Sequence, residues 1–588
     1  MTTDQNYQQI YRVGGMLDSG FVGQITYTIS LDQVYDELDI HFSFDKRLYS
    51  ESDVTPELID RLQTLCTAKY DAPIYPVEEF RQTILHEMKT EIHTMAELND
   101  NFIGCIHRQL TDRHMLYTKE FTSDGCLAQD TFSGVLKVTV LVFNVLLDNT
   151  QYTLTVSGHP VGQGVIAPNF NLMDTLKTAA GNAGASNAAG SADNSCDAES
   201  APASAVATAG SSGVSGAGSA ATAGDSSTTG SSSAGNTVTA STRFKRLELH
   251  NHTVESDGSL TCQELTEYLA ADHVDAFAIT DHNTTSGQKK IEQLLEEKHY
   301  PISLIRGMEY TTYFGHILCL NLAKYVPWNS IDQHRPELLF EAAREKGALV
   351  GIAHPFSYGD PFARGCRFEM TISDYSKVDF IEIFNNPEPL HEVNERGTNL
   401  WMSLIFSGYQ ITATSGMDLH NRAKLAGCYA TYIEGKNGGN IASELDTAIH
   451  THRTWVSKGA LLLTEVLPET NELLLTFTDA HKTGFAVPKT AQAVLKGKDK
   501  TFTTSVSLDK PVRVSLNQLS GTDPIIPLLY EAPGINGAAT VSNAAHVAAS
   551  TSCGSAADTS SAAGQLKEID ALPAIEGLLC VSPVLYRD

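Results

Sequence analysis

Alternating apolar and polar positions dominate the first part of the chain. The pattern is clear in "QITYTISL" and "LDIHFSFD", where every second residue is apolar, and it returns between residues 135 and 156. Such alternation is typical of strands with one buried face. Residues 78–98, "EEFRQTILHEMKTEIHTMAEL", favour a helix. We therefore expect residues 1–177 to form an α+β accessory domain with an antiparallel, sandwich-like sheet.

The pattern changes at residue 243. Short apolar runs such as "AFAIT", "ALVGIA" and "FIEIF" alternate with amphipathic stretches such as "TCQELTEYLAAD" and "PELLFEAAREKG". Repeated strand–helix units predict a parallel sheet, either closed as a barrel or open and doubly wound. We assign this pattern to a central domain over residues 243–457.

Two low-complexity stretches interrupt the chain. Residues 178–242 contain no Leu, Ile, Lys, Arg or aromatic residue, and such a segment buries too little apolar surface to offset its ordering entropy. We expect a disordered Ala/Gly/Ser linker there. Residues 458–588 return to short strands and predict a small β domain, with a second disordered loop at about 532–565.

Charge and composition restrict the partners. The formal net charge of −28 argues against a nucleic-acid duplex and against an anionic membrane. No apolar run approaches the ~20 residues that span a bilayer, and the N-terminus lacks a recognisable secretory signal. Ten scattered cysteines without a CxxC pair fit reduced thiols in the cytoplasm. We expect a cytoplasmic protein with a small-molecule substrate, and composition leaves its oligomeric state open.

Candidate metal ligands follow the apolar runs of the central domain. In a parallel barrel these carboxyl ends converge on one rim, where active sites form. The i, i+2 spacing of His250/His252 and of Asp418/His420 directs each pair to one side of an extended chain. Six such coincidences within one block of the sequence are not plausibly independent. The candidates are His250, His252, Asp257, His282, Glu309, His316, His354, Asp418 and His420, and Asp281 stands directly before the candidate ligand His282.

A second HxH pair serves as a comparison. His450 and His452 end a stretch, "IASELDTAIH", whose periodicity predicts a helix. On a helix, side chains at i and i+2 diverge, so this pair should not share a metal ion.

The motifs "HNH", "ITDHN", "GMEYTT", "FGHIL", "AHP" and "DLH", in this order over residues 245–435, resemble the polymerase-and-histidinol-phosphatase (PHP) superfamily. The nearest branch is that of CehA/McbA-like metallohydrolases. The resemblance implies a distorted (β/α)7 barrel with two or three divalent metal ions, Zn, Mn or Fe, at its rim. The full expectation is thus a multi-domain protein in which this PHP barrel is flanked by the N-terminal domain and the small C-terminal β domain.

The resemblance also assigns roles. His250, His252 and Asp418 would hold one metal, Glu309 would bridge to a second held by His316 and His354, and Asp257, His282 and His420 would form a third site. The position of Asp257 is histidine in some family members, and a carboxylate there favours a harder ion such as Mn²⁺. Glu309 and Asp418 would thus be catalytic, together with Asp281, which would orient a histidine.

The substrate is less well defined by the sequence. Arg364 and Arg367 follow His354, Arg422 and Lys424 follow His420, and Asn385 follows "FIEIF". Arginine forks suit phosphate oxygens, and this favours a phosphoesterase acting on a small phosphorylated metabolite or nucleotide. Two alternatives stay open: a carbamate or carboxylic ester hydrolase with the same metal site, and a non-catalytic PHP regulatory module.

Overall fold

The structure is a computed structural model that describes most of the N-terminal, central and C-terminal segments. The expected linker at 178–242 and nearly all of the expected loop at 532–565 lie outside the described residues. The described ranges are 7–70, 76–108, 110–161, 243–329, 331, 334–385, 392–480, 485–519, 524–532 and 575–586.

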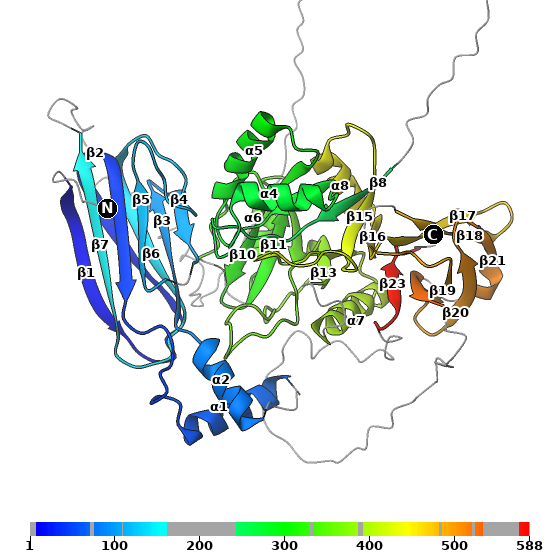
Figure 1. The fold of residues 1–588 in the computed structure, drawn as a ribbon, viewed down its shortest axis with the longest axis horizontal. Coiled ribbons are helices and arrows are strands. Elements are labelled where there is room, and N and C mark those ends of the chain that lie inside the picture. Colours follow the sequence, from blue (N-terminus) through cyan, green and yellow to red (C-terminus); the bar gives the residue numbers. More distant parts are fainter. Residues whose placement is uncertain are drawn as a thin grey trace, which may run out of the picture. The chain divides into compact units, whose positions relative to one another are not determined.

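The N-terminal segment forms a seven-stranded antiparallel sheet in the order β1-β7-β2-β6-β3-β4, with β5 paired to β2 (Figure 1). The alternation at Leu38, Ile40 and Phe42 buries these three side chains in the core of the sheet, as expected for a strand with one apolar face. The strands are β1 (Gln8–Leu17), β2 (Gly23–Phe44), β3 (Glu91–Leu98), β4 (Asn101–Ile106), β5 (Asp112–Tyr117), β6 (Phe132–Asn144) and β7 (Thr150–Pro160).

The helix predicted over residues 78–98 is wrong in its second half. The structure has helix α1 (Pro56–Tyr70) and a short helix α2 (Val77–His86), after which the chain enters strand β3. β3 lies between β6 and β4 and is buried on both faces. Ile92 packs in the core of the N-terminal sheet and Met95 in a cluster shared with the central segment. Burial of both faces hid the period-two pattern from which a strand is recognised.

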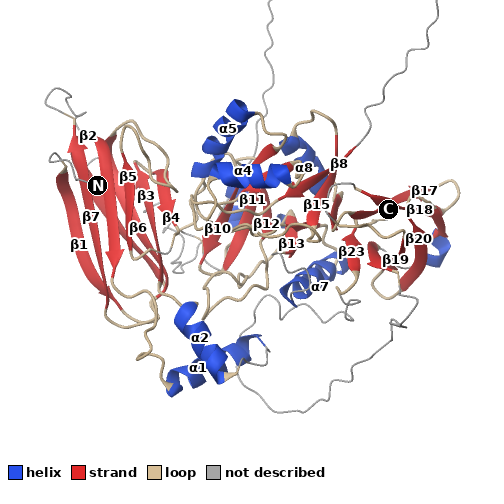
Figure 2. Ribbon diagram, viewed as in Figure 1, coloured by secondary structure: helices blue, strands red, loops and turns tan. Residues whose placement is uncertain are grey.

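The central segment is built on strands β8 to β15, and Figure 2 shows helices packed around these strands. Their order is β14-β13-β12-β11-β10-β9-β8-β15. The strands are β8 (Arg243–Glu248), β9 (Ala276–Ile279), β10 (Ser303–Thr312), β11 (Gly315–Leu320), β12 (Leu349–Ile352), β13 (Phe380–Phe384), β14 (Thr412–Ser415) and β15 (Ala430–Gly435). The helices are α4 (Cys262–Ala271), α5 (Ser286–Lys298), α6 (Glu337–Arg344), α7 (Glu392–Phe406) and α8 (Ile441–His450), with a 3-10 turn η1 (Tyr375–Lys377).

This sheet is not the all-parallel repeat that the sequence predicted. β8, β9 and β10 are parallel, as are β12, β13 and β14, but β11 is antiparallel to both neighbours and β15 is antiparallel to β8. Only two residues, 313 and 314, join β10 to β11, and so short a connection can join only antiparallel strands. The closed (β/α)7 barrel is therefore not confirmed.

The C-terminal segment continues the central sheet. β16 pairs with β23, and β22, β19 and β20 follow, while β17, β18 and β21 form a separate three-stranded sheet. The predicted boundary between the central and C-terminal domains, at residue 457, thus falls within one continuous sheet. The domain boundaries stay predictions. The elements are β16 (Thr454–Ser457), β17 (Ala460–Leu467), β18 (Glu472–Asp479), β19 (Thr490–Lys496), β20 (Thr501–Ser507), β21 (Val512–Ser515), η2 (Leu516–Leu519), β22 (Ile526–Glu531) and β23 (Leu578–Val581).

Two further features bear on location. Within the described ranges, none of the helices has the length and apolar character needed to cross a membrane. The described cysteines that the structure assigns as free include the buried Cys105 and Cys319. The cytoplasmic location stays a prediction.

Candidate metal centre

The predicted ligands come together although they lie on separate strands. His250 and His252 follow β8, His282 follows β9, Glu309 lies in β10, His316 in β11, His354 follows β12, and Asp418 and His420 follow β14. Backbone bridges tie these loops to one another, because Asn251 pairs with Leu419 and His282 with Glu309. Side chains separated by up to 170 positions therefore face one small volume.

Glu309 lies at the middle of this volume and is fully buried. Its Oε2 atom is 3.0 Å from Nε2 of His250 and 3.2 Å from Nε2 of His252. Oδ1 of Asp418 lies 3.4 Å and 3.0 Å from the same two nitrogens. These four side chains form the first cluster, in which the three residues predicted to hold the first metal lie beside Glu309.

The second cluster uses the other oxygen of Glu309. Oε1 lies 2.8 Å from Nδ1 of His316 and 3.0 Å from Nε2 of His354. Nδ1 of His282 is 3.1 Å from Oε2. One carboxylate is thus shared by two groups of imidazoles, the arrangement expected of a ligand that bridges two cations.

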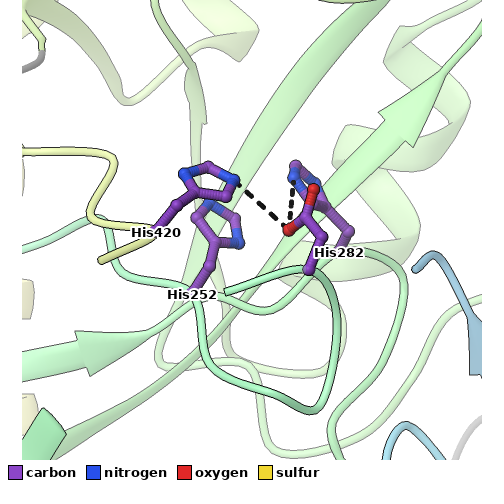
Figure 3. Close-up of side chains that lie close together, drawn as sticks. His252, His282 and His420 are labelled. Atoms are coloured by element: carbon purple, nitrogen blue, oxygen red, sulfur yellow. Dashed lines mark ion pairs between the residues drawn. The ribbon is translucent and has the colours of Figure 1, made fainter. Parts of the chain in front are cut away.

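The third cluster contains His252, Asp257, His282 and His420, whose candidate ligand atoms all lie within 4.8 Å of one another. Oδ1 of Asp257 is 3.2 Å from Nε2 of His420 and 3.7 Å from Nε2 of His282, the two ion pairs drawn as dashed lines in Figure 3. The rings of His252 and His420 stack at 4.3 Å between centroids. His252 and His282 each adjoin two clusters, so the three groups interlock.

The donor set fits divalent metal ions. Four donors at 2.0–2.1 Å from a tetrahedral Zn²⁺ lie about 3.3 Å from one another, close to the nitrogen–oxygen separations in the first cluster. Several buried donor atoms also have no hydrogen-bond partner in the structure, a state that costs free energy unless an ion satisfies them. They are His250 Nε2, His252 Nε2, Asp257 Oδ1, Glu309 Oε2 and Asp418 Oδ1.

The electrostatics agree with a site for cations. Burial alone raises the pKa of Glu309, but His250, His316 and His282 outweigh it and hold that pKa well below the ordinary value. Burial lowers the pKa of His250, but Glu309, Glu382 and Asp418 raise it well above the ordinary value. Without a metal these carboxylates therefore favour a protonated His250, and metal binding must displace that proton.

Glu382 of β13 is a residue that the sequence analysis missed. Its carboxylate is 1% exposed and accepts hydrogen bonds from Nδ1 of His250, at 3.0 Å to Oε1, and from the backbone N–H of His354, at 3.0 Å to Oε2. A carboxylate on the far nitrogen of a ligating histidine fixes the tautomer and the ring orientation. A lone Glu in the apolar run "FIEIF" was the available signal.

Asp281 does not orient a histidine through its described hydrogen bonds. Its oxygens accept bonds from the backbone N–H of Thr253 at 2.8 Å, from Thr253 Oγ1 at 2.8 Å and from Ser256 Oγ at 2.6 Å. These bonds order the loop between His252 and Asp257. The orienting role expected of Asp281 is instead performed by Glu382, for His250, and a catalytic role for Asp281 stays a prediction.

The predicted substrate residues occupy varied environments. Arg364 donates to Asp360 at 3.0 Å, Arg367 lies over the rings of Tyr70 and Phe356, and Arg422 lies over Tyr268. Lys424 is exposed. Asn385 is buried and its Nδ2 donates to Glu382 at 2.9 Å, which makes it a support for the His250 partner. Contact of these five residues with a substrate stays a prediction.

The comparison pair lies outside these clusters. His450 is the last residue of α8, and its Nδ1 donates to the Asp446 carbonyl at 2.9 Å. His452 is 2.9 Å from Thr412 Oγ1 through Nδ1. Among the candidate metal groups of the described residues, none contains either side chain.

Each comparison with known proteins covers only part of the chain. Residues 7–160 match a family described as a family of unknown function (DUF6669). A stretch of 141 residues is 36% identical to a 5′-3′ exoribonuclease of Haemophilus influenzae, over 23% of this chain and 50% of that protein. A stretch of 79 residues is 34% identical to the 5′-3′ exoribonuclease Rnm of Escherichia coli, over 13% of this chain and 27% of that protein.

One further match is to an archaeal protein. An uncharacterized protein of Methanocaldococcus jannaschii is 30% identical over 112 residues, which is 19% of this chain and 58% of that protein. The chain thus spans only about half or less of the exoribonucleases and little more than half of the archaeal protein.

Solved structures give weak matches. A two-domain protein from Bacteroides vulgatus, described as containing a predicted PHP-like metal-dependent phosphoesterase, is 15% identical, with a TM-score of 0.29 over 49% of this chain and 90% of that chain. An amidohydrolase from Chromobacterium violaceum is 16% identical, with a TM-score of 0.21 over 30% and 87%. TM-scores of this size do not define a shared fold, so the interpretation rests on the geometry of the site.

Proposed function

We propose that this protein is a metal-dependent hydrolase of the PHP type, and more specifically a phosphoesterase. The observation that carries the proposal is Glu309, a buried carboxylate whose two oxygens face two groups of histidines. A bridging carboxylate between histidine clusters is typical of sites with paired cations. Such cations lower the pKa of a bound water towards 7 and neutralise charge on the attacked oxygen and the leaving group.

The residues of this chain prepare the site for that chemistry. His250, His252 and Asp418 would hold one cation, and His316, His354 and Glu309 the next. Glu382 and the bonds from Asp281 to the 253–256 loop hold the ligands in place before a substrate arrives. Because these side chains are buried, they need no reorganisation during the reaction.

Two observations favour a phosphoester as substrate. The segment after His354 carries Arg364 and Arg367. A guanidinium group can donate two parallel hydrogen bonds to two oxygens of one phosphate. Part of the chain is similar to proteins named 5′-3′ exoribonucleases, which act on phosphodiesters. We infer a small phosphorylated compound or the phosphorylated end of a nucleotide as the substrate, since a charge of −28 disfavours a duplex.

A substrate panel tests the proposal. Full-length protein reconstituted with Mn²⁺, Zn²⁺ or Fe²⁺ is assayed on p-nitrophenyl phosphate, bis-p-nitrophenyl phosphate, a 5′-phosphorylated ribo-oligonucleotide and p-nitrophenyl acetate. We expect metal-dependent turnover of at least one phosphate ester and little turnover of the acetate. Turnover of the acetate alone would replace the phosphoesterase with an ester or carbamate hydrolase.

The arginines give a second, independent readout. Loss of a charge-assisted hydrogen bond costs about 1.5–3 kcal/mol, or roughly 10- to 150-fold in kcat/KM. Arg364→Ala and Arg367→Ala should lower kcat/KM for phosphate esters by this factor and leave the acetate unaffected. The same substitutions at Arg422 and Lys424 show whether the effect is confined to the segment after His354.

A further inference from the structure

Three buried polar side chains of the N-terminal sheet lie together. Glu91 and His93 are at i and i+2 of β3, so both point to the same face of the strand. His107 directly follows β4, and the pairing of Thr94 with Ile106 places it beside His93. The ring centroids of His93 and His107 are 4.0 Å apart.

The geometry of this group resembles that of the central clusters. Nε2 of His93 is 3.1 Å from Oε1 of Glu91, and one donor atom from each of the three residues lies within 4.8 Å of the others. All three are buried, with 6% exposure for Glu91, 0% for His93 and 5% for His107. Two imidazoles and a carboxylate are a common donor set for Zn²⁺ and other first-row transition metals.

Asp257 links this group to the third cluster. Its Oδ1 atom faces His420 and His282, while its Oδ2 atom is 3.3 Å from Nε2 of His107. The ring of His107 also stacks on His282 with 4.1 Å between centroids. Asp257 therefore presents one oxygen to each group, as Glu309 does between the first two clusters, and offers a fourth donor to the N-terminal residues.

Apolar side chains pack against the group, and the buried Arg113 also acts electrostatically on His93. Met95 on the same face of β3, together with Leu141 and Phe143 of β6, belongs to a core cluster shared with the central strands, and Phe143 lies 4.4 Å from the His93 ring. An ionised carboxylate in such a place is costly unless a charge of opposite sign compensates it. A divalent cation held by the three residues would add such a charge and leave both histidines neutral, as metal ligation requires.

We propose that Glu91, His93 and His107 hold a divalent transition-metal ion, in an additional site that shares Asp257 with the third cluster. This inference goes beyond the proposed function and does not depend on which ester is hydrolysed. It gives the N-terminal domain a part in the metal centre, because the added ion holds Asp257 from the side opposite His420. A second contact supports the coupling, since the N–H of Gly125 donates to Oε2 of Glu255 at 3.0 Å, two residues before Asp257.

Anomalous diffraction on crystals of the full-length protein, reconstituted with Zn²⁺ or Mn²⁺, tests the site directly. We expect a peak surrounded by Glu91, His93 and His107, in addition to the peaks around Glu309. Occupied central clusters with no peak at these three residues would overturn the proposal and leave them as a hydrogen-bonded network.

Metal content in solution gives the second measurement. Glu91→Gln, which keeps the size of the side chain, and His93→Ala should each bind one equivalent less than the wild type. His159→Ala is the matched control, because His159 is a partly exposed histidine of the same sheet and belongs to none of the candidate metal groups of the described residues. Unchanged metal content in a folded Glu91→Gln variant contradicts the proposal. A protein that shows the peak but hydrolyses no phosphate ester would refute the proposed function and leave this inference standing.

Discussion

His250 and Glu382 form a buried pair in which Nδ1 of the histidine donates to Oε1 of the carboxylate over 3.0 Å. This bond leaves Nε2 of His250 directed at Glu309 and Asp418, where the structure gives it no hydrogen-bond partner. The pair therefore sets the one nitrogen that is available to a metal ion.

Removal of the Glu382 charge should weaken metal binding without unfolding the protein. Glu382→Gln keeps the shape of the side chain but no longer stabilises the required tautomer of His250, and losses of this kind are typically 10- to 100-fold in metal affinity or activity. Competition with a chromophoric chelator measures the affinity. Glu434→Gln, at an exposed position of strand β15, is the control. Equal affinities for Glu382→Gln and the wild type would remove Glu382 from the metal site.

Gly416 should be intolerant of any side chain. A Cβ atom on this residue would lie 2.4 Å from Cβ of His250 and 2.7 Å from Oε1 of Glu382. Gly416→Ala must therefore push apart the pair described above, and we expect it to lower metal content and activity together. A Gly416→Ala variant with normal metal content would show that the backbone at this position moves freely.

The stability of the metal-free protein should depend on Glu248. Burial raises the pKa of this carboxyl to about 8 from its ordinary 4.5, so the folded protein binds a proton that the unfolded chain releases between these values. Glu248 makes its whole contribution to the free energy of unfolding below pH 4.5. This contribution decreases as the pH rises and is lost by about pH 8. Glu248→Gln should therefore gain stability relative to the wild type on going from pH 5 to pH 8.

Urea unfolding of chelator-treated protein at the two pH values measures this difference, with Glu434→Gln again as the exposed control. The hydrogen bond from the N–H of Met417 to Oε1 of Glu248, at 2.7 Å, can be kept by the glutamine. A stability difference that stays constant with pH would mean that Glu248 titrates normally in the folded protein.

The sequence predicted the site best where candidate metal ligands stand at the ends of predicted strands. His250, Glu309 and Asp418 were predictable because each stands just beyond or inside a short apolar run. The structure places Nε2 of His250 3.0 Å from Glu309 and 3.4 Å from Asp418. The pair His450/His452 could be distinguished from the metal ligands, because the periodicity of the sequence predicted a helix that ends at His450.

Other features of the fold and of the metal site could not be predicted from the sequence, for physical reasons. β3 is buried on both faces, so Glu91 and His93 were read as part of a helix and their i, i+2 relation went unnoticed. His107 is separated from Asp257 by 150 residues, and no local sequence pattern predicts a contact between residues of two different sheets. The reversed direction of β11 depended on a two-residue turn that carries no Gly, Asn or Asp, the usual signal for a hairpin.

Elemental analysis of the purified full-length protein, paired with phosphatase assays, tests the central claim most directly. The wild type should contain at least two equivalents of transition metal, and His250→Ala should lose metal and activity together, because His250 contacts both Glu309 and Asp418. His450→Ala, at the exposed end of α8, should keep both. Wild-type protein that is free of metal and still hydrolyses phosphate esters would contradict the account.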